Sequence, residues 1–227
     1  FGTEGEAWHW QDGGTCELKE KVQISLHDLT GFEGRCDAIL LSADTAWEPP
    51  HEGKELAELR KRLTSIGLKP TDGGQFDLVV VGGGVAGTTA AITAARLGLQ
   101  VALVQDRPVL GGNGSSEVRV WPQGHTNQEP YPHVGDVVSE LIRQPGPGDA
   151  NAGDAHVFDD QRKLALARAE PNLRLFLNQR VNAAEAKDQT ITSVTAQHTR
   201  SGLRTRLTAN LFLDSTGDGV LGALVGA

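Results

Sequence analysis

Three glycines have the spacing of a loop that binds a dinucleotide. Gly82, Gly84 and Gly87 form the pattern Gly-x-Gly-x-x-Gly directly after the apolar run 77–81. In such a loop the first glycine permits a tight turn, the second lets the backbone approach a pyrophosphate, and the third lets the helix pack on the strand. The N-terminus of that helix offers free N–H groups and partial positive charge to phosphates. The pattern therefore predicts a dinucleotide site, and a turn that merely connects strand to helix is the alternative.

The acidic residue expected at the end of the next strand is missing. A carboxylate there usually accepts hydrogen bonds from ribose hydroxyls. Gln105 stands at this position, followed by Asp106 and Arg107. The amide oxygen of Gln105 can accept a hydrogen bond, and Asp106 could reach the ribose instead. The sequence leaves open which of the two contacts the ribose, and a polar strand exit without any such contact is the alternative.

The segments around the glycine loop indicate a strand-helix-strand unit. Residues 77–81 and 99–105 are apolar, as in parallel strands covered on both faces. Small residues fill 88–97 between them, and Gly98 is a helix stop. Helices are expected at 134–143 and 156–169, and strands at 173–177, 180–186, 190–198, 203–209 and 211–213. The predicted fold class is α/β, a Rossmann-like domain with a parallel sheet and an inserted β-meander.

The first part of the chain has a different pattern. Residues 1–42 alternate between polar and apolar in the manner of strands, and we predict the C-terminal part of an antiparallel β-sandwich module there. Residues 43–75 are predicted to be a linker with one amphipathic helix, and 76–227 the cofactor-binding domain, incomplete at its C-terminus. The chain begins at Phe1 and holds no methionine, so we expect a fragment cut at both ends.

The composition and net charge argue against nucleic-acid binding, a membrane span and a metal cluster. The 227 residues carry a net charge of −8 without a basic stripe, so a nucleic acid partner is not expected. No apolar run is long enough for a membrane span, which predicts a soluble protein. Cys16 and Cys36 are too few for an iron–sulfur cluster, and no Cys-x-x-Cys pair suggests a metal site. A disulfide between them, as in an exported protein, and two reduced core cysteines are equally open, so the compartment is not assigned.

Two further motifs carry a family resemblance. Residues 108–116 include Gly111-Gly112, and residues 212–219 include Thr216-Gly217. With the glycine loop first and the meander between these motifs, residues 76–227 resemble the FAD-dependent oxidoreductases with a glutathione-reductase-like flavin fold. The nearest branch includes the flavoprotein subunit of heterodisulfide reductase. The cysteines typical of that branch are absent, so electron relay through a cluster is not implied.

The resemblance implies a role for each of these motifs. Gly111 and Gly112 would lie along the FAD pyrophosphate, while the hydroxyls of Ser115 and Ser116 would donate to phosphate or ribityl oxygens. The turn after the last strand would pass near the ADP part, and Val181 would offer a backbone contact to adenine. The candidate cofactor-binding residues are Gly82, Gly84, Gly87, Gln105, Asp106, Arg107, Gly111, Gly112, Asn113, Ser115, Ser116, Val181, Thr216, Gly217 and Asp218.

Other chemistry-bearing residues are less specific. Trp8 and Trp10 lie on one face of a predicted strand, which loosely resembles carbohydrate-binding modules, although core filling is the alternative. The segment that could approach a flavin or a substrate carries His125, His133, His156 and the pair Glu117 and Arg119. A solvated loop explains these side chains equally well, so no catalytic residue is assigned.

The motifs together favour an FAD-dependent oxidoreductase that takes hydride from an organic substrate. That substrate would be a small molecule or derived from carbohydrate, and the electron acceptor stays open. An NAD(P)-binding dehydrogenase is the first alternative, although a plain NAD domain would continue with further strand-helix units in place of the meander. The second alternative is a glycan-binding module fused to a catalytically inactive flavin-fold scaffold.

Overall fold

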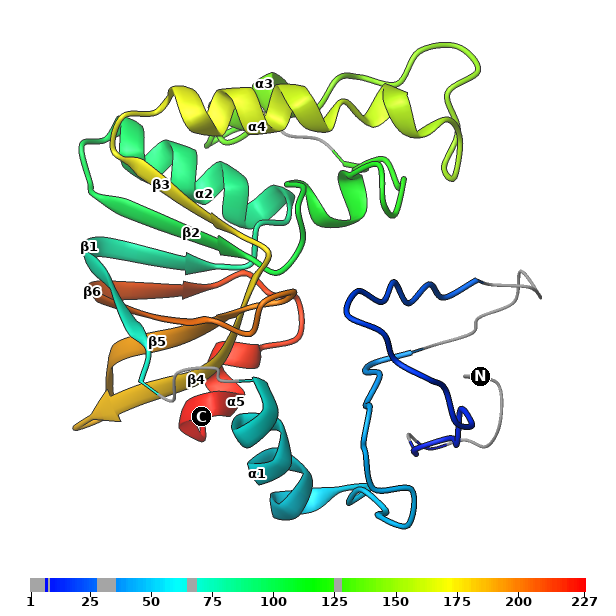
Figure 1. Cartoon of the computed structure of the whole chain (residues 1–227). Coiled ribbons are helices and arrows are strands. Elements are labelled where there is room, and N and C mark those ends of the chain that lie inside the picture. Colours follow the sequence, from blue (N-terminus) through cyan, green and yellow to red (C-terminus); the bar gives the residue numbers. More distant parts are fainter. Residues whose placement is uncertain (1–6, 8, 28–35, 65–68, 125–127) are drawn as a thin grey trace. The chain divides into compact units, whose positions relative to one another are not determined.

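The structure, a computed structural model, describes residues 7, 9–27, 36–64, 69–124 and 128–227. The chain divides into two compact units, Phe1–Ser65 and Ile66–Ala227 (Figure 1). The second unit contains the glycine motifs and is described first.

The second unit is built on one six-stranded sheet with the order β3-β2-β1-β6-β5-β4. Strands β1, β2, β3 and β6 are parallel, whereas β4 and β5 continue the sheet in antiparallel pairing. The strands are β1 (Thr71–Val81), β2 (Val101–Gln105), β3 (Leu173–Leu177), β4 (Gln179–Lys187), β5 (Thr190–His198) and β6 (Arg204–Asp214). The prediction of a mixed α/β fold with a mostly parallel sheet is confirmed.

The last strand differs from its prediction. Two strands, 203–209 and 211–213, were expected, but β6 runs unbroken from Arg204 to Asp214. It pairs with β1 along its length and with β5 over its first half, so neighbouring strands hold its backbone through the exposed Asn210. The third strand of the meander and the last parallel strand are therefore one element.

Both faces of the parallel strands are covered, which explains why β1 and β2 are apolar throughout. Helices α2 (Val85–Arg96), α3 (Asp136–Leu141) and α4 (Asp160–Ala169) cover one face (Figure 1). Their core includes Val80 and Leu103. On the opposite face, Val79 and Val104 pack with residues of β4, β5 and β6 and with Leu221 of α5 (Val220–Val225). Because adjacent residues of a strand point to opposite faces of the sheet, they contribute to two separate hydrophobic cores.

The helix expected at 156–169 is divided. A 3-10 turn, η2 (Ala155–Phe158), precedes α4, and Asp159 between them adopts the left-handed conformation with φ 46°. The Asp159 side chain accepts a hydrogen bond from Arg162 N at 3.1 Å and so caps α4. The Asp159 carboxylate accordingly lies at the N-terminus of α4.

The first unit contains α1 (Gly53–Thr64), which buries Leu59, and the described residues of this unit contain no strand. Although strands were expected within 1–42, the described residues of this range form none, and Val22 and Ile24 are about half exposed, at 47% and 51%. Alternating residues form a stable strand only against neighbouring strands. The sandwich module and the three domain limits stay predictions. Cys16 and Cys36 are free and exposed, so neither the disulfide nor the core position is seen.

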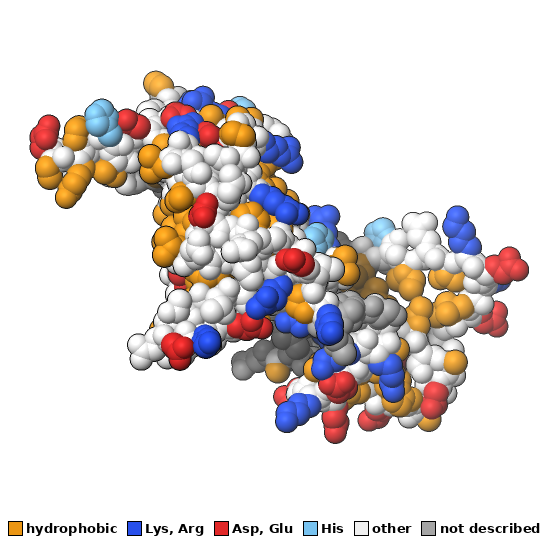
Figure 2. All heavy atoms as spheres, turned by 90° about the vertical axis from the view of Figure 1, so that its left-hand side faces the viewer, with side chains coloured by type: hydrophobic (Ala, Val, Ile, Leu, Met, Phe, Trp, Pro, Cys, Tyr) orange, Lys and Arg blue, Asp and Glu red, His pale blue; other side chains and the backbone are white. Residues whose placement is uncertain are grey.

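Two further observations concern the described residues as a whole. None of their helices is long and apolar enough to cross a bilayer. They also bring together no three His, Cys, Asp or Glu side chains that could hold a metal ion. In the view of Figure 2, basic and acidic side chains are interspersed.

Candidate cofactor-binding site

The carboxyl ends of the four parallel strands meet at one edge of the sheet. Val81 at the end of β1 lies opposite Val104 of β2 and Asp214 of β6, and Gln105 lies opposite Leu177 of β3. Strands β2 and β6 flank β1, so the chain changes its direction across the sheet at β1. Ligands of such sheets bind outside the carboxyl ends at this point.

Each glycine of the loop after β1 has a distinct surrounding. Gly82 has φ +101°, and a Cβ there would lie 2.5 Å from Ser215 O, so the turn rests against the end of β6. A Cβ on Gly87 would come closer than 3.0 Å to Gly82 O, which allows α2 to pack on the turn. A Cβ on Gly84 would meet no atom within 4 Å, and its φ of −63° is ordinary. Of these three glycines, only Gly84 could carry a side chain without a clash with the rest of the protein.

The N-terminus of α2 faces this open position with free donors. The first N–H of the helix with an intrahelical acceptor is that of Thr88, which donates to Gly84 O at 2.9 Å. The N–H groups of Val85 and Ala86 precede it, and Gly84 at the N-cap supplies no side-chain acceptor. Uncapped N–H groups beside a glycine without neighbours suit an anionic group such as a diphosphate. The residues present therefore fit the pyrophosphate of a dinucleotide.

Gln105 occupies a supporting position. It is only 5% exposed, and its Oε1 accepts a hydrogen bond from Gly83 N at 2.8 Å. Its Nε2 donates to Val109 O at 3.2 Å, so the amide joins the glycine loop to the segment after β2. Both ends of the amide are engaged inside the protein, whereas the predicted ribose contact required its oxygen to face a ligand. Asp106 and Arg107 are exposed, and Arg107 Nη1 lies 3.3 Å from Glu117 Oε2.

The Gly111-Gly112 turn lies beside the glycine loop, although Gly111 and Gly112 follow Gly82 by 29 and 30 positions in the sequence. Gly111 N donates to Gly83 O at 2.8 Å, and a Cβ on Gly112 would lie 3.1 Å from Gly84 Cα. Gly111 and Gly112 have φ +107° and +54°. The structure thus brings together the two glycine motifs, with Asn113 exposed in the short 3-10 turn η1 (Gly112–Gly114) that follows.

The two serines after this turn point into the protein. Ser115 is completely buried, and its Oγ donates to Gly112 O at 2.7 Å. Ser116 donates through both Oγ and N to the Asp160 carboxylate. The resemblance implied that both hydroxyls bind the cofactor, but each has an intramolecular acceptor. The linear motif does not indicate Asp160 as the partner of Ser116, because Asp160 lies 44 residues further along the chain.

The turn after β6 is organised by Asp214, which the sequence motifs did not single out as a site residue. Its Oδ1 accepts from Thr216 Oγ1 at 2.7 Å, and its Oδ2 accepts from Leu221 N at 2.7 Å. Burial alone would raise the pKa of Asp214, but hydrogen bonds from Thr216 and from the N–H groups of α5 outweigh it and hold the pKa below its usual value. The Thr216 hydroxyl also accepts from Val220 N and is thereby engaged internally.

The glycines of this turn are open. Gly217 and Gly219 have φ +82° and +65°, and a Cβ on either would meet no atom within 4 Å. Asp218 between them is exposed. Because Gly82 packs against Ser215 and Thr216, this turn borders the glycine loop on the side opposite Gly112.

Val181 lies in β4, where its backbone pairs with Ala196 and its side chain is buried among the core residues of that face. The preceding turn brings this strand to the site edge, since Asn178 N donates to Arg107 O at 3.1 Å. The backbone contact with adenine stays a prediction.

The remaining candidates are spread over the surface. Trp10 Nε1 donates to Pro50 O at 2.9 Å, while Trp8 and His125 lie outside the described residues. His133 and His156 are exposed and form contacts with Asp136 and Asp154. Arg119 donates to Gly153 O at 3.0 Å. None of these contacts indicates a catalytic group.

The fold and the three glycine turns define a Rossmann-like dinucleotide-binding protein. A family model described as FAD dependent oxidoreductase matches residues 77–227, and the chain belongs to this family. The predicted class of enzyme, an oxidoreductase, and its predicted cofactor, FAD, are thereby confirmed for the family.

Individual relatives match shorter segments. The mitochondrial dihydrolipoyl dehydrogenase of Schizosaccharomyces pombe is 47% identical over 55 residues, which are 24% of this chain and 10% of that protein. The fumarate reductase (cytochrome) of Shewanella frigidimarina is 32% identical over 103 residues, which are 44% of this chain and 18% of that protein. A geranylgeranyl bacteriochlorophyll reductase-like structure from Thermoplasma acidophilum has a TM-score of 0.45 and 19% identity, covering 67% of this chain and 42% of that one. The chain therefore spans less than a fifth of the length of these two curated relatives.

Proposed function

We propose that this chain carries the FAD-binding region of an oxidoreductase and that the cofactor's diphosphate lies over Gly84. The open space at Gly84 carries the proposal, because the flanking Gly82 and Gly87 are closely surrounded by protein while Gly84 meets nothing within 4 Å. An ordinary side chain would fit there sterically, so packing within the chain does not explain the glycine. A ligand that approaches the backbone does.

The chain's own groups supply what a bound diphosphate needs. The N–H groups of Val85 and Ala86 would donate to its oxygens, aided by the partial positive charge of the α2 N-terminus. Gly112 lies against Gly84, and because neither residue has a side chain, the diphosphate could lie over both turns. When bound, FAD would supply the ring that accepts a hydride from the substrate.

Ribose recognition is proposed to fall to Asp106. The Gln105 amide is engaged with Gly83 and Val109, whereas Asp106 is exposed at the same strand end. Its carboxylate would accept hydrogen bonds from the two ribose hydroxyls. Val181 is proposed to contact adenine through its backbone, and the open Gly217 to Gly219 turn to border the remainder of the cofactor. The substrate is proposed to be an organic small molecule or a carbohydrate derivative.

The test is a titration of the purified chain, stripped of any bound nucleotide, with FAD and separately with NAD⁺ and NADP⁺. We expect FAD to bind, to be retained as a yellow band through gel filtration, and to be displaced by excess ADP. NAD⁺ should not displace it at equal concentration. Binding of NAD⁺ or NADP⁺ without binding of FAD would contradict the proposal and support the dehydrogenase alternative.

A further inference from the structure

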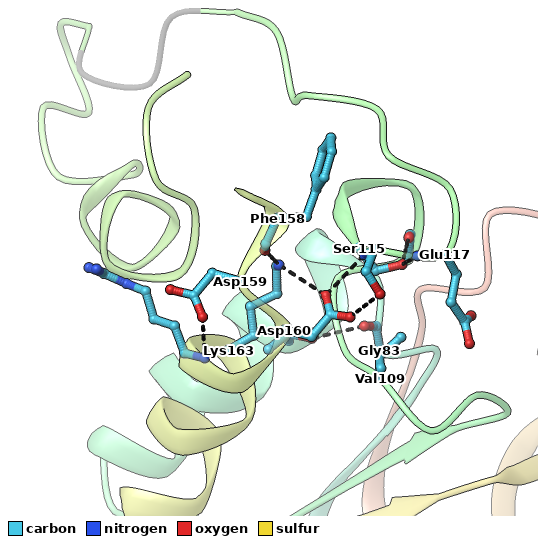
Figure 3. A network of polar contacts seen from close by, with 12 residues as sticks. Gly83, Val109, Ser115, Glu117, Phe158, Asp159, Asp160 and Lys163 are labelled. Carbon is cyan, nitrogen blue, oxygen red and sulfur yellow. Dashed lines mark hydrogen bonds and ion pairs between the residues drawn. The ribbon is translucent and has the colours of Figure 1, made fainter. Parts of the chain in front are cut away.

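A buried lysine lies behind the Gly111-Gly112 turn. Lys163 of α4 is only 1% exposed, although lysine side chains rarely leave the surface unless they are paired. Its Nζ donates to Phe158 O and lies 3.5 Å from Asp160 Oδ1 (Figure 3). Burial lowers the pKa of Lys163, and the charge of Asp160 opposes this shift. The roles described so far leave this lysine unexplained.

The methylene stem of Lys163 packs directly behind Gly111. A Cβ on Gly111 would lie 2.9 Å from both Cδ and Cε of Lys163. The methylene groups therefore fill the space behind the turn that a side chain at residue 111 would occupy. Gly111 also has φ +107°, so glycine is required there for its backbone as well.

The partner carboxylate holds the other end of the same turn. Asp160 Oδ1 accepts from Ser116 N at 3.1 Å, and Asp160 Oδ2 accepts from Ser116 Oγ. The segment between Gly111 and Ser116 is thus fixed at its start by the lysine stem and at its end by the carboxylate. Gly111 N joins the segment to the glycine loop through Gly83 O.

From this geometry we propose that Lys163 and Asp160 are positioning residues for diphosphate binding. They would hold the Gly111-Gly112 turn at the distance from Gly84 that a diphosphate requires, without touching the ligand. The inference rests on the proposed function. It predicts that weakening this support lowers affinity for ligands that contain the diphosphate and spares ligands that lack it.

The experiment compares Lys163→Met with the unmodified full chain. Methionine keeps most of the stem that packs behind Gly111 but removes the ammonium group, so the stem loses its anchor at Phe158 O and the Asp160 carboxylate loses its cation. Lys187→Met is the matched control, because it makes the same change of charge at an exposed residue at the end of β4. Calorimetric titrations would measure the Kd of FAD, ADP and adenosine for each protein.

We expect Lys163→Met to raise the Kd of FAD and ADP about tenfold, because a less firmly held turn weakens the contact with the diphosphate by an amount comparable to one charged hydrogen bond. The Kd of adenosine should stay within about twofold, and Lys187→Met should leave all three unchanged. Unchanged ADP binding by Lys163→Met, or an equal loss for ADP and adenosine, would overturn the inference. If the unmodified chain bound neither FAD nor ADP, the proposed function itself would fail, and the inference with it.

Ser116→Ala is the second variant if Lys163→Met does not fold. It removes the hydroxyl that donates to Asp160 and leaves the buried lysine paired. The Kd of ADP should rise about threefold and that of adenosine should not change, since a neutral donor contributes less than a charged one. A Kd for ADP equal to that of the unmodified chain would also overturn the inference.

Discussion

Replacing Gly87 by alanine should destabilise the second unit even though alanine favours helices. Gly87 lies in the first turn of α2 and is buried against the glycine loop. A Cβ there would meet Gly82 O, Gly82 C and Ser215 Cβ, all at 3.1 Å or less. Two of these three atoms are backbone atoms, so no rotamer change can relieve the overlap and α2 would have to move away from β1.

The size of the effect follows from two opposing contributions. Overpacking of a close-packed interior costs about 1–3 kcal/mol, and a backbone clash belongs at or above the upper end. Alanine in a helix gains about 1 kcal/mol over glycine. The net loss in the free energy of unfolding should therefore be about 2 kcal/mol or more, which for a unit of this size lowers the Tm by about 4–8 °C.

Urea denaturation followed by circular dichroism, without FAD, would measure this loss. Gly84→Ala is the matched control, because it makes the same chemical change three residues earlier where a Cβ meets no atom. In this control, alanine at the N-cap lowers the free energy of unfolding by about 1 kcal/mol. The smaller conformational freedom of the unfolded chain raises it by about 0.4–1 kcal/mol, so the net change should be small. Equal stabilities of Gly87→Ala and Gly84→Ala would refute the explanation that close packing at residue 87 requires glycine.

Three further predictions concern groups around the site. Gln105→Leu should lower the free energy of unfolding by about 2–4 kcal/mol in urea denaturation, because Gly83 N–H and Val109 C=O lose their buried partner; unchanged stability would contradict it. Asp214 has a pKa held below its ordinary 3.8, so its stabilisation is present above that pH and is lost as the pH falls through the folded-state value. Acid unfolding should consequently be steeper below pH 3.8 for the natural chain than for Asp214→Asn, and parallel curves would count against this role. Glu140→Gln weakens the bidentate, partly exposed ion pair with Arg96. It should lower the free energy of unfolding by at most about 1 kcal/mol, and by less in high salt. A loss of stability that does not depend on salt would argue against an ionic origin.

The strand-helix-strand unit, the turn at Gly82 and the close packing at Gly87 were predictable because their causes are local. The turn at Gly82, the donors of α2 and the apolar run of β1 depend on residues within a single unit. The family resemblance implied that Gly111 and Gly112 lie along the FAD pyrophosphate, which stays a prediction, and the structure places their turn next to Gly84.

The roles of the polar side chains were less predictable, because a hydroxyl or amide can serve either a ligand or the protein. Ser115 and Thr216 matched the motifs expected to contact the cofactor, yet their hydroxyls bond to Gly112 O and Asp214. Gln105 turns inward to Gly83. Each choice depends on a neighbour that the folded backbone brings into reach, which the linear pattern does not contain.

The strands expected before residue 43 depend on partners that their alternating pattern does not specify. The alternation of apolar residues such as Val22 and Ile24 indicates only that one side of this segment would be apolar if it were extended. A strand also needs a partner for its N–H and C=O groups, and the described residues of the first unit supply none.

The Kd of FAD for Gly84→Ala, measured against that of the unmodified chain, tests the central claim most directly. A methyl group over Gly84 should displace the diphosphate from the α2 N–H groups, and the loss of two hydrogen bonds to a charged group raises the Kd by about a hundredfold or more. The free energy of unfolding without FAD should stay within about 1 kcal/mol of the natural value. A Kd for FAD within about twofold of that of the unmodified chain would contradict the placement of the diphosphate over Gly84.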